Sequence, residues 1–266
     1  MASTNIILCF TSLLLLLLQI YADPISPYAS NCGEILSGEA GGISYKPFEL
    51  SNVAERCIWV LRVPRATSYN VVLYNKGTSA SDKVIATALS QDKPEVHTLL
   101  SVVDTSYSVN GSVAVITFYA YRGTGTSTGF SLYYDAVLNE TNPVSPYSTD
   151  YVISANETEI LYPRIGGVYA NNELSTFIFT PNFQYLLNQR VTVNVTVLGM
   201  EQNCDDLLTV YQLPAIPSSN PTWMKLGRIC GVDNQVALSN SDVIMLVFQS
   251  DESYVSSGFR LSCKLN

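Results

Sequence analysis

Short runs of β-branched and aromatic residues dominate the chain, and turn residues separate them at fairly regular intervals. Typical runs are CIWVLRV, SVAVITFYAY, VTVNVTVL and VIMLVFQS. Helical periodicity is nearly absent. In VTVNVTVL four valines alternate with polar residues, which predicts a strand that holds Asn194 on its wet face. Strands of this kind and spacing are typical of an all-β sandwich.

The first 22 residues differ from the rest. They contain an uncharged run with six leucines, Leu13 to Leu18, and a small residue, Ala22, before Asp23. This pattern predicts a secretory signal peptide at residues 1–22. Because no Lys or Arg precedes the apolar run, an uncleaved signal anchor is the alternative. No later stretch approaches the roughly 20 apolar residues that cross a bilayer, so we expect a soluble, secreted, extracellular protein.

The two halves of the remaining chain resemble each other. The stretch VAVITFYAYRGTGTSTGFSLYY matches VIMLVFQSDESYVSSGFRLS: each has a strand that ends in Phe, a polar loop, a Gly-Phe pair and a closing strand. A repeat this long indicates tandem domains, because solenoid units are much shorter. The intervening LNETNPVSPYSTD is rich in turn residues. We therefore predict domains at residues 28–137 and 151–266, joined by a linker at 138–150.

The net charge and the sequence motifs narrow the range of possible functions. The formal net charge is −8, which disfavours nucleic acid and anionic membranes and favours cationic partners or divalent metal ions. The chain has one histidine, His97, and it lacks the G-x-S-x-G and H-E-x-x-H motifs of common hydrolases. We expect a protein that is not an enzyme, and a hydrolase built around His97 is the alternative.

Cysteines and glycan acceptors support export. Five cysteines remain after the predicted cleavage, and in an oxidising compartment they indicate disulfides. Two pairs lie close in sequence, Cys32 with Cys57 and Cys204 with Cys230. Cys263 has the parity of Phe259 and Leu261, which favours a buried free thiol over an intermolecular bridge. The N-x-[ST] sequons are at Asn110, Asn139, Asn156 and Asn194.

Each half carries a set of short motifs. They are Cys32-Gly33, Gly42-Ile43-Ser44, Pro47, Cys57-Ile58-Trp59 and Pro64 in the first half, and Cys204-Asp205-Asp206, Cys230-Gly231, Ser250-Asp251-x-Ser253 and Gly258-Phe259 in the second. These motifs resemble those of the CUB domain, a jelly-roll-like antiparallel β-sandwich of secreted and cell-surface proteins. The resemblance implies two tandem CUB-like domains. Each copy is incomplete, because the first lacks the second cysteine pair and the second lacks the first, with Phe177 near the expected tryptophan.

The resemblance also implies a calcium site in the second domain. Its ligands would be Glu201, Asp206 and Asp251, with oxygen from Ser253. Calcium prefers six to eight oxygen ligands, and like charges gathered at one place repel unless a cation neutralises them. The stretch EQNCDD is shorter than the family's, so the sequence leaves open whether Glu201 reaches the ion, and Asp205 is the nearest substitute for Asp206. The alternative is three solvated acids that never meet.

No calcium is expected in the first domain, where Arg122 lies in the corresponding loop. In such domains calcium orders the loops, so that a carboxylate, flanked here by Tyr254, meets a Lys or Arg of a partner protein. We therefore expect calcium-dependent binding of an extracellular protein with exposed basic groups. A carbohydrate-binding, lectin-like module is the alternative, which the 17 tyrosines would suit.

Overall fold

The computed structural model describes residues 28–51, 55–77, 82–91, 95–120, 127–154, 157–164, 167–180, 191–213, 222–232, 235–240 and 243–265. The regular elements in these ranges are all β-strands, so none of them is a helix that could span a membrane. The predicted signal peptide, the sequon at Asn156 and the loop residue Arg122 lie outside the described residues.

The first half of the chain forms two five-stranded sheets. Sheet A has the order β1 (Tyr28–Ala29), β3 (Ala40–Ser51), β10 (Ser127–Leu138), β5 (Ala66–Asn75) and β8 (Ser106–Val109). Sheet B has the order β2 (Ile35–Leu36), β4 (Glu55–Leu61), β9 (Val113–Ala120), β6 (Lys83–Leu89) and β7 (Val96–Leu100).

The second half repeats this arrangement with one strand fewer. Sheet C has the order β11 (Asp150–Ile153), β13 (Leu174–Phe179), β18 (Val243–Gln249), β15 (Leu207–Leu213) and β16 (Met224–Ile229). Sheet D has the order β12 (Glu157–Tyr162), β19 (Gly258–Leu265), β14 (Val191–Gly199) and β17 (Gln235–Asn240). Pairing is antiparallel except at the short edge strands β1, β2 and β11. The predicted all-β fold of tandem sandwiches is confirmed.

Each sandwich contains an equivalent cluster of four buried rings. Phe177 of β13 occupies the position that Trp59 has on β4: its ring lies 5.5 Å from Phe259, and that of Trp59 lies 5.4 Å from Phe130. Edge-to-face contacts of this kind add to the burial of the rings. The clusters consist of Tyr45, Trp59, Phe118 and Phe130, and of Tyr162, Phe177, Phe248 and Phe259.

The repeated Gly-Phe pair has a packing reason. A Cβ atom on Gly129 would lie 1.8 Å from the Tyr45 carbonyl oxygen, and one on Gly258 would lie 2.0 Å from the Tyr162 carbonyl oxygen. Gly258 also has a φ of +73°, which other residues rarely adopt. At both positions only glycine lets the closing strand approach its neighbour closely enough to bury the next phenylalanine.

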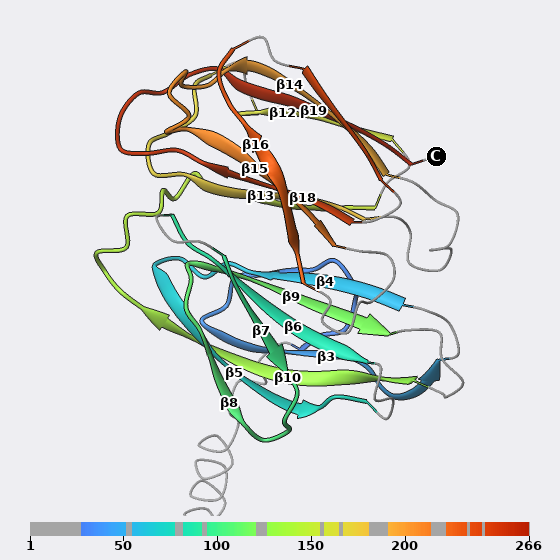
Figure 1. The fold of residues 1–266 in the computed structure, drawn as a ribbon. Coiled ribbons are helices and arrows are strands. Elements are labelled where there is room, and N and C mark those ends of the chain that lie inside the picture. Colours follow the sequence, from blue (N-terminus) through green and yellow to red (C-terminus); the bar gives the residue numbers. More distant parts are fainter. Residues whose placement is uncertain are drawn as a thin grey trace, which may run out of the picture.

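The four sheets stack in the order A, B, C, D (Figure 1). Sheets A and B enclose one core, and sheets C and D enclose another. Because sheets B and C also pack face to face, a third apolar cluster joins the two halves. We call it the interface cluster; it comprises Ile58, Val60, Leu89, Val113, Val115, Leu174, Ile178, Tyr211, Leu213, Trp223, Val243, Met245 and Val247.

A buried ion pair also joins the halves. Arg62, directly after β4, donates two hydrogen bonds to the carboxylate of Asp150, at the start of β11, and one to the carbonyl oxygen of Leu174. The side chain of Asp150 is 1% exposed and that of Arg62 is 16% exposed. The two domains are therefore packed against each other by apolar and charged contacts as well as joined by a linker.

Cysteines and sequons follow the strand pattern. Disulfides link Cys32 to Cys57 and Cys204 to Cys230, and Cys263 is a buried free thiol. In β14 the valines are buried and Asn194 is exposed, as the alternation predicts. Asn110 and Asn139 are also exposed, so the three described sequons are accessible to glycosylation.

Candidate functional site

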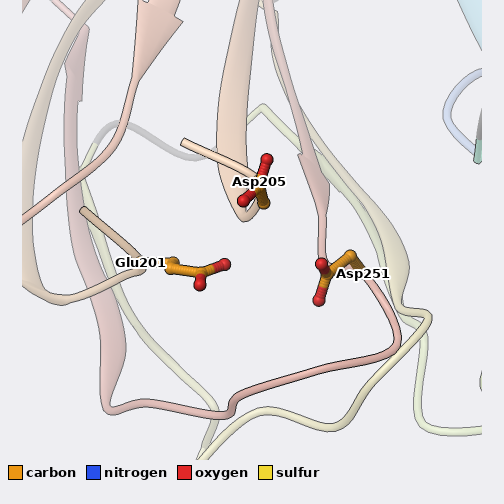
Figure 2. Close-up of side chains that lie close together, drawn as sticks. All are labelled: Glu201, Asp205 and Asp251. Carbon is orange, nitrogen blue, oxygen red and sulfur yellow. The ribbon is translucent and has the colours of Figure 1, made fainter. Parts of the chain in front are cut away.

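Three carboxylates from separate loops meet at one end of the second sandwich. Glu201 follows β14, Asp205 lies in the turn before β15, and Asp251 follows β18. One oxygen atom of each lies within 4.8 Å of those of the other two. Figure 2 shows the three side chains facing a common space between the loops. We call this group the acid cluster.

Glu201 reaches the cluster, which the sequence had left open. Its Oε2 atom is buried and has no hydrogen-bond partner in the described part of the chain. Burial, together with the negative charges of Asp205, Asp206 and Asp251, raises the pKa of Glu201. A carboxylate in this position is unfavourable unless a proton or a cation balances its charge.

The structure gives Asp206 a different place from the predicted one. It is fully buried, and the third acid of the cluster is its neighbour Asp205. Asp206 accepts hydrogen bonds from the hydroxyl of Tyr169 and, at 2.9 Å, from the backbone N–H of Asp251. Burial is the main cause of its raised pKa. Asp206 therefore fixes the start of the Asp251 loop from behind the cluster.

The loop after β18 is held by its own side chains. Ser253 donates from its backbone N–H and its hydroxyl to the Asp251 carboxylate, at 2.7 and 3.1 Å. Tyr254 follows with a φ of 53° and a side chain that is 75% exposed. The sequence-predicted Ser253 thus orients Asp251, and Tyr254 projects at the surface beside it.

A groove of about 370 Å³ adjoins the acid cluster. Asp205 and Asp251 lie on its wall, and so do Gln91 and Glu95 of the first half. Four hydrogen bonds connect the halves here. Gln91 donates to the Ser250 carbonyl oxygen and Tyr211 donates to Glu95. The side-chain amide of Gln249 donates to the carbonyl oxygens of Ser90 and Gln91. No pattern in the sequence indicates this composite wall, because it depends on how sheets B and C pack.

A second cavity, of about 830 Å³, lies on the other side of the Asp251 loop. Four tyrosines line it, and two of them, Tyr162 and Tyr169, are buried. Tyr169 also carries the hydrogen bond to Asp206. The other residues that line the cavity include Arg164, Glu173 and Val255. We call it the tyrosine cavity. In the sequence, only the abundance of tyrosine could have indicated this cavity.

The known proteins that are similar to the chain are solved structures of low sequence identity. No family model matches the chain, and no curated protein matches it. Similar solved structures include the CUB1-EGF-CUB2 domains of human MASP-1/3, at 15% identity over 86% of this chain and all of that one, with a TM-score of 0.37. The CUB1-EGF-CUB2 domains of rat MASP-1 are similar at 15% identity over 90% of this chain and all of that one, with a TM-score of 0.33.

The full extracellular region of zebrafish Gpr126/Adgrg6 is also similar, at 11% identity and a TM-score of 0.33, over 87% of this chain and 37% of that one. Both MASP structures are named as CUB domain regions, the family that the sequence resembles. The two disulfides are typical of proteins from oxidising, extracellular compartments. In its described residues the chain is thus an all-β protein of tandem sandwiches.

Proposed function

We propose that the chain is an extracellular glycoprotein that binds another protein through a calcium-ordered surface on its second half. The acid cluster carries this proposal: loops distant in sequence bring one oxygen of each of three carboxylates within 4.8 Å of the others, and one oxygen of Glu201 is buried with no hydrogen-bond partner among the described residues. Such a donor set suits calcium, which prefers carboxylate and carbonyl oxygens. A cation there would remove the repulsion that raises the pKa of Glu201.

Each acid has a distinct part in the proposed site. Glu201, Asp205 and Asp251 would hold the ion, whose bound charge would order the three loops. Asp206 stays behind them and positions the backbone of Asp251. Ser253 fixes the orientation of the Asp251 carboxylate by donating two hydrogen bonds to it. This division follows from burial, because Asp206 is fully enclosed and already has a donor on each oxygen.

The groove beside the cluster supports a protein partner. Its acidic wall, formed by Asp205, Asp251 and Glu95, suits a Lys or Arg side chain of the partner. Lys225 and Arg228 line the same groove, so a complementary surface would carry an acidic group next to its basic one. The proposed contact therefore includes residues of both halves.

We propose a binding role for the chain and no catalytic role for its histidine. His97 lies on β7, and its Nδ1 atom is 3.0 Å from the hydroxyl of Thr87 on the neighbouring strand β6. Burial lowers the pKa of His97. This histidine forms a hydrogen bond between two strands at the edge of sheet B, which supports a structural role for it.

Calcium titration of the full secreted chain by isothermal calorimetry tests the site. We expect saturable binding by the wild type. The Asp251→Asn and Asp205→Asn variants should each bind calcium at least about tenfold more weakly, because affinity depends on the number of charged ligands. The full chain is used because the second half alone would expose the interface cluster.

Glu252→Gln is the matched control, since Glu252 is an exposed acid next to Asp251. It should bind calcium like the wild type and, like the wild type, be retained by immobilised poly-lysine until a chelator is added. Calcium affinity that is unchanged by Asp251→Asn would remove that residue from the site. Retention that ignores the chelator would refute calcium-dependent recognition of basic groups.

A further inference from the structure

The tyrosine cavity has the size and composition of a small-molecule site. Its volume of about 830 Å³ lies within the range of roughly 300–1,000 Å³ typical of ligand pockets. Its walls are mostly apolar and aromatic. Three of its residues expose large side chains at the surface: Tyr147 is 76% exposed, Val168 is 58% exposed and Val255 is 45% exposed. A ligand that covered these three side chains would gain apolar contact.

The acidic groups of the cavity are already balanced. Asp150 forms the ion pair with Arg62 and accepts a further hydrogen bond from Thr176. Glu173 is 2% exposed and accepts hydrogen bonds from the Tyr162 hydroxyl and the Ala170 N–H. Burial raises the pKa of Glu173, which favours its neutral form. Neither group therefore offers an available charge to a cationic ligand.

The available charge of the cavity is positive. Arg164 lies over the ring of Tyr151, with its guanidinium carbon 5.5 Å from the ring centre. No acid of the described chain forms an ion pair with this guanidinium, which is exposed. A stacked guanidinium is held in place and presents a planar set of donors that matches a carboxylate. The site thus combines an apolar cavity with one anchored cation.

We infer that the tyrosine cavity binds a small organic anion, with its apolar ring-containing body against the tyrosines and its carboxylate on Arg164. A neutral sugar would meet few hydrogen-bond partners on these apolar walls. A cationic ligand would face Arg164, and the ionised acid of the cavity, Asp150, is already paired with Arg62. This site is distinct from the acid cluster, which lies beyond the Asp251 loop.

Three isosteric probes of different charge test this inference: 2-naphthoate, 2-naphthalenemethanol and 2-naphthylmethylamine. Each is titrated into the full chain with a chelator present, and binding is followed by saturation-transfer NMR. We expect naphthoate to bind at least about tenfold more tightly than the alcohol, because only the carboxylate can accept a charge-assisted bidentate contact from the guanidinium. The amine should bind least. Because calcium is removed, the result does not depend on the acid cluster.

Two variants and their matched controls locate the site. Arg164→Gln should abolish the preference for the acid over the alcohol, whereas Arg260→Gln, an exposed arginine on sheet D, should leave it intact. Tyr147→Ala should weaken all three probes, whereas Tyr28→Ala, an exposed tyrosine of the first half, should not. Equal affinity for the three probes, an effect of neither cavity variant, no binding at millimolar concentration, or binding of lactose in their place would each overturn the inference.

Discussion

At the scale of single residues, strand parity separates the acids that gather from the acid that supports them. Asp206 has the parity of Leu208 and Val210, and both of these face the core between sheets C and D. Parity therefore directs Asp206 inward, and Asp205 is left to join Glu201 at the surface. The family resemblance pointed to the loop that contains both aspartates, and elementary strand geometry determines which of the two faces the acid cluster.

The raised pKa of Glu201 and Asp206 leads to a pH dependence. Both groups bind protons more readily when folded, so without calcium the free energy of unfolding should fall as pH rises from the ordinary range of carboxyl groups through the raised pKa values. Calcium bound at the proposed site would reverse much of this fall, because it would favour the ionised carboxylates of the cluster. Denaturant unfolding between pH 4 and 7, with chelator and with calcium, measures both effects.

The Glu201→Gln variant provides the control for this pH dependence. Its decline in stability with pH should be shallower than that of the wild type in chelator, because one of the titrating groups is gone. A change in stability with pH that is equally steep in the chelated Glu201→Gln variant and the chelated wild type would contradict the assignment.

At the scale of elements, the sequence predicted most of the strands and their faces. Alternation placed Asn194 outside and Cys263 inside, and the repeated Gly-Phe pairs predicted equivalent closing strands. The sequence alone did not predict what packs against each face of the apolar strands that lack alternation. The strands β4, β9 and β18 are apolar on both faces. One face lies in a sandwich core and the other lies in the interface cluster, and such runs indicate burial without identifying the partner.

The ion pair between β4 and β11 should matter more than its exposed counterpart. Arg62→Ala would leave the Asp150 carboxylate buried without compensation, and we expect the free energy of unfolding to fall by about 3–5 kcal/mol. Arg65 pairs with Glu140 at the surface, where the side chains are 51% and 83% exposed, so Arg65→Ala should cost less than about 1 kcal/mol. Urea denaturation of both variants measures the difference.

Similar losses in the two arginine variants would mean that the Arg62 pair does not join the halves as described. The sequence predicted neither the ion pair nor the packing of the two halves against each other. Residues 138–150 were predicted to be a linker between the domains, and an arginine after one strand gives no sign that it pairs with an aspartate 88 positions later.

At the scale of the whole molecule, the four stacked sheets should unfold as one unit. The chain has two tryptophans, and they lie in separate clusters: Trp59 in the first core and Trp223 in the interface cluster. We expect Trp59→Phe and Trp223→Phe variants, each with one remaining tryptophan, to show single fluorescence transitions that coincide with the circular dichroism of the same protein. A variant whose fluorescence and circular dichroism midpoints differ would show that the halves unfold separately.

The face-to-face packing of sheets B and C has a consequence for recognition. Two domains on a flexible tether lose orientational freedom when one partner engages both, and that loss weakens the complex. Here the groove is assembled before any partner arrives, because Glu95 of the first half and Asp251 of the second already line the same wall. A partner that fits the groove would therefore not have to restrict the relative motion of the two domains when it binds. Its selectivity would depend on the spacing of its own charged groups.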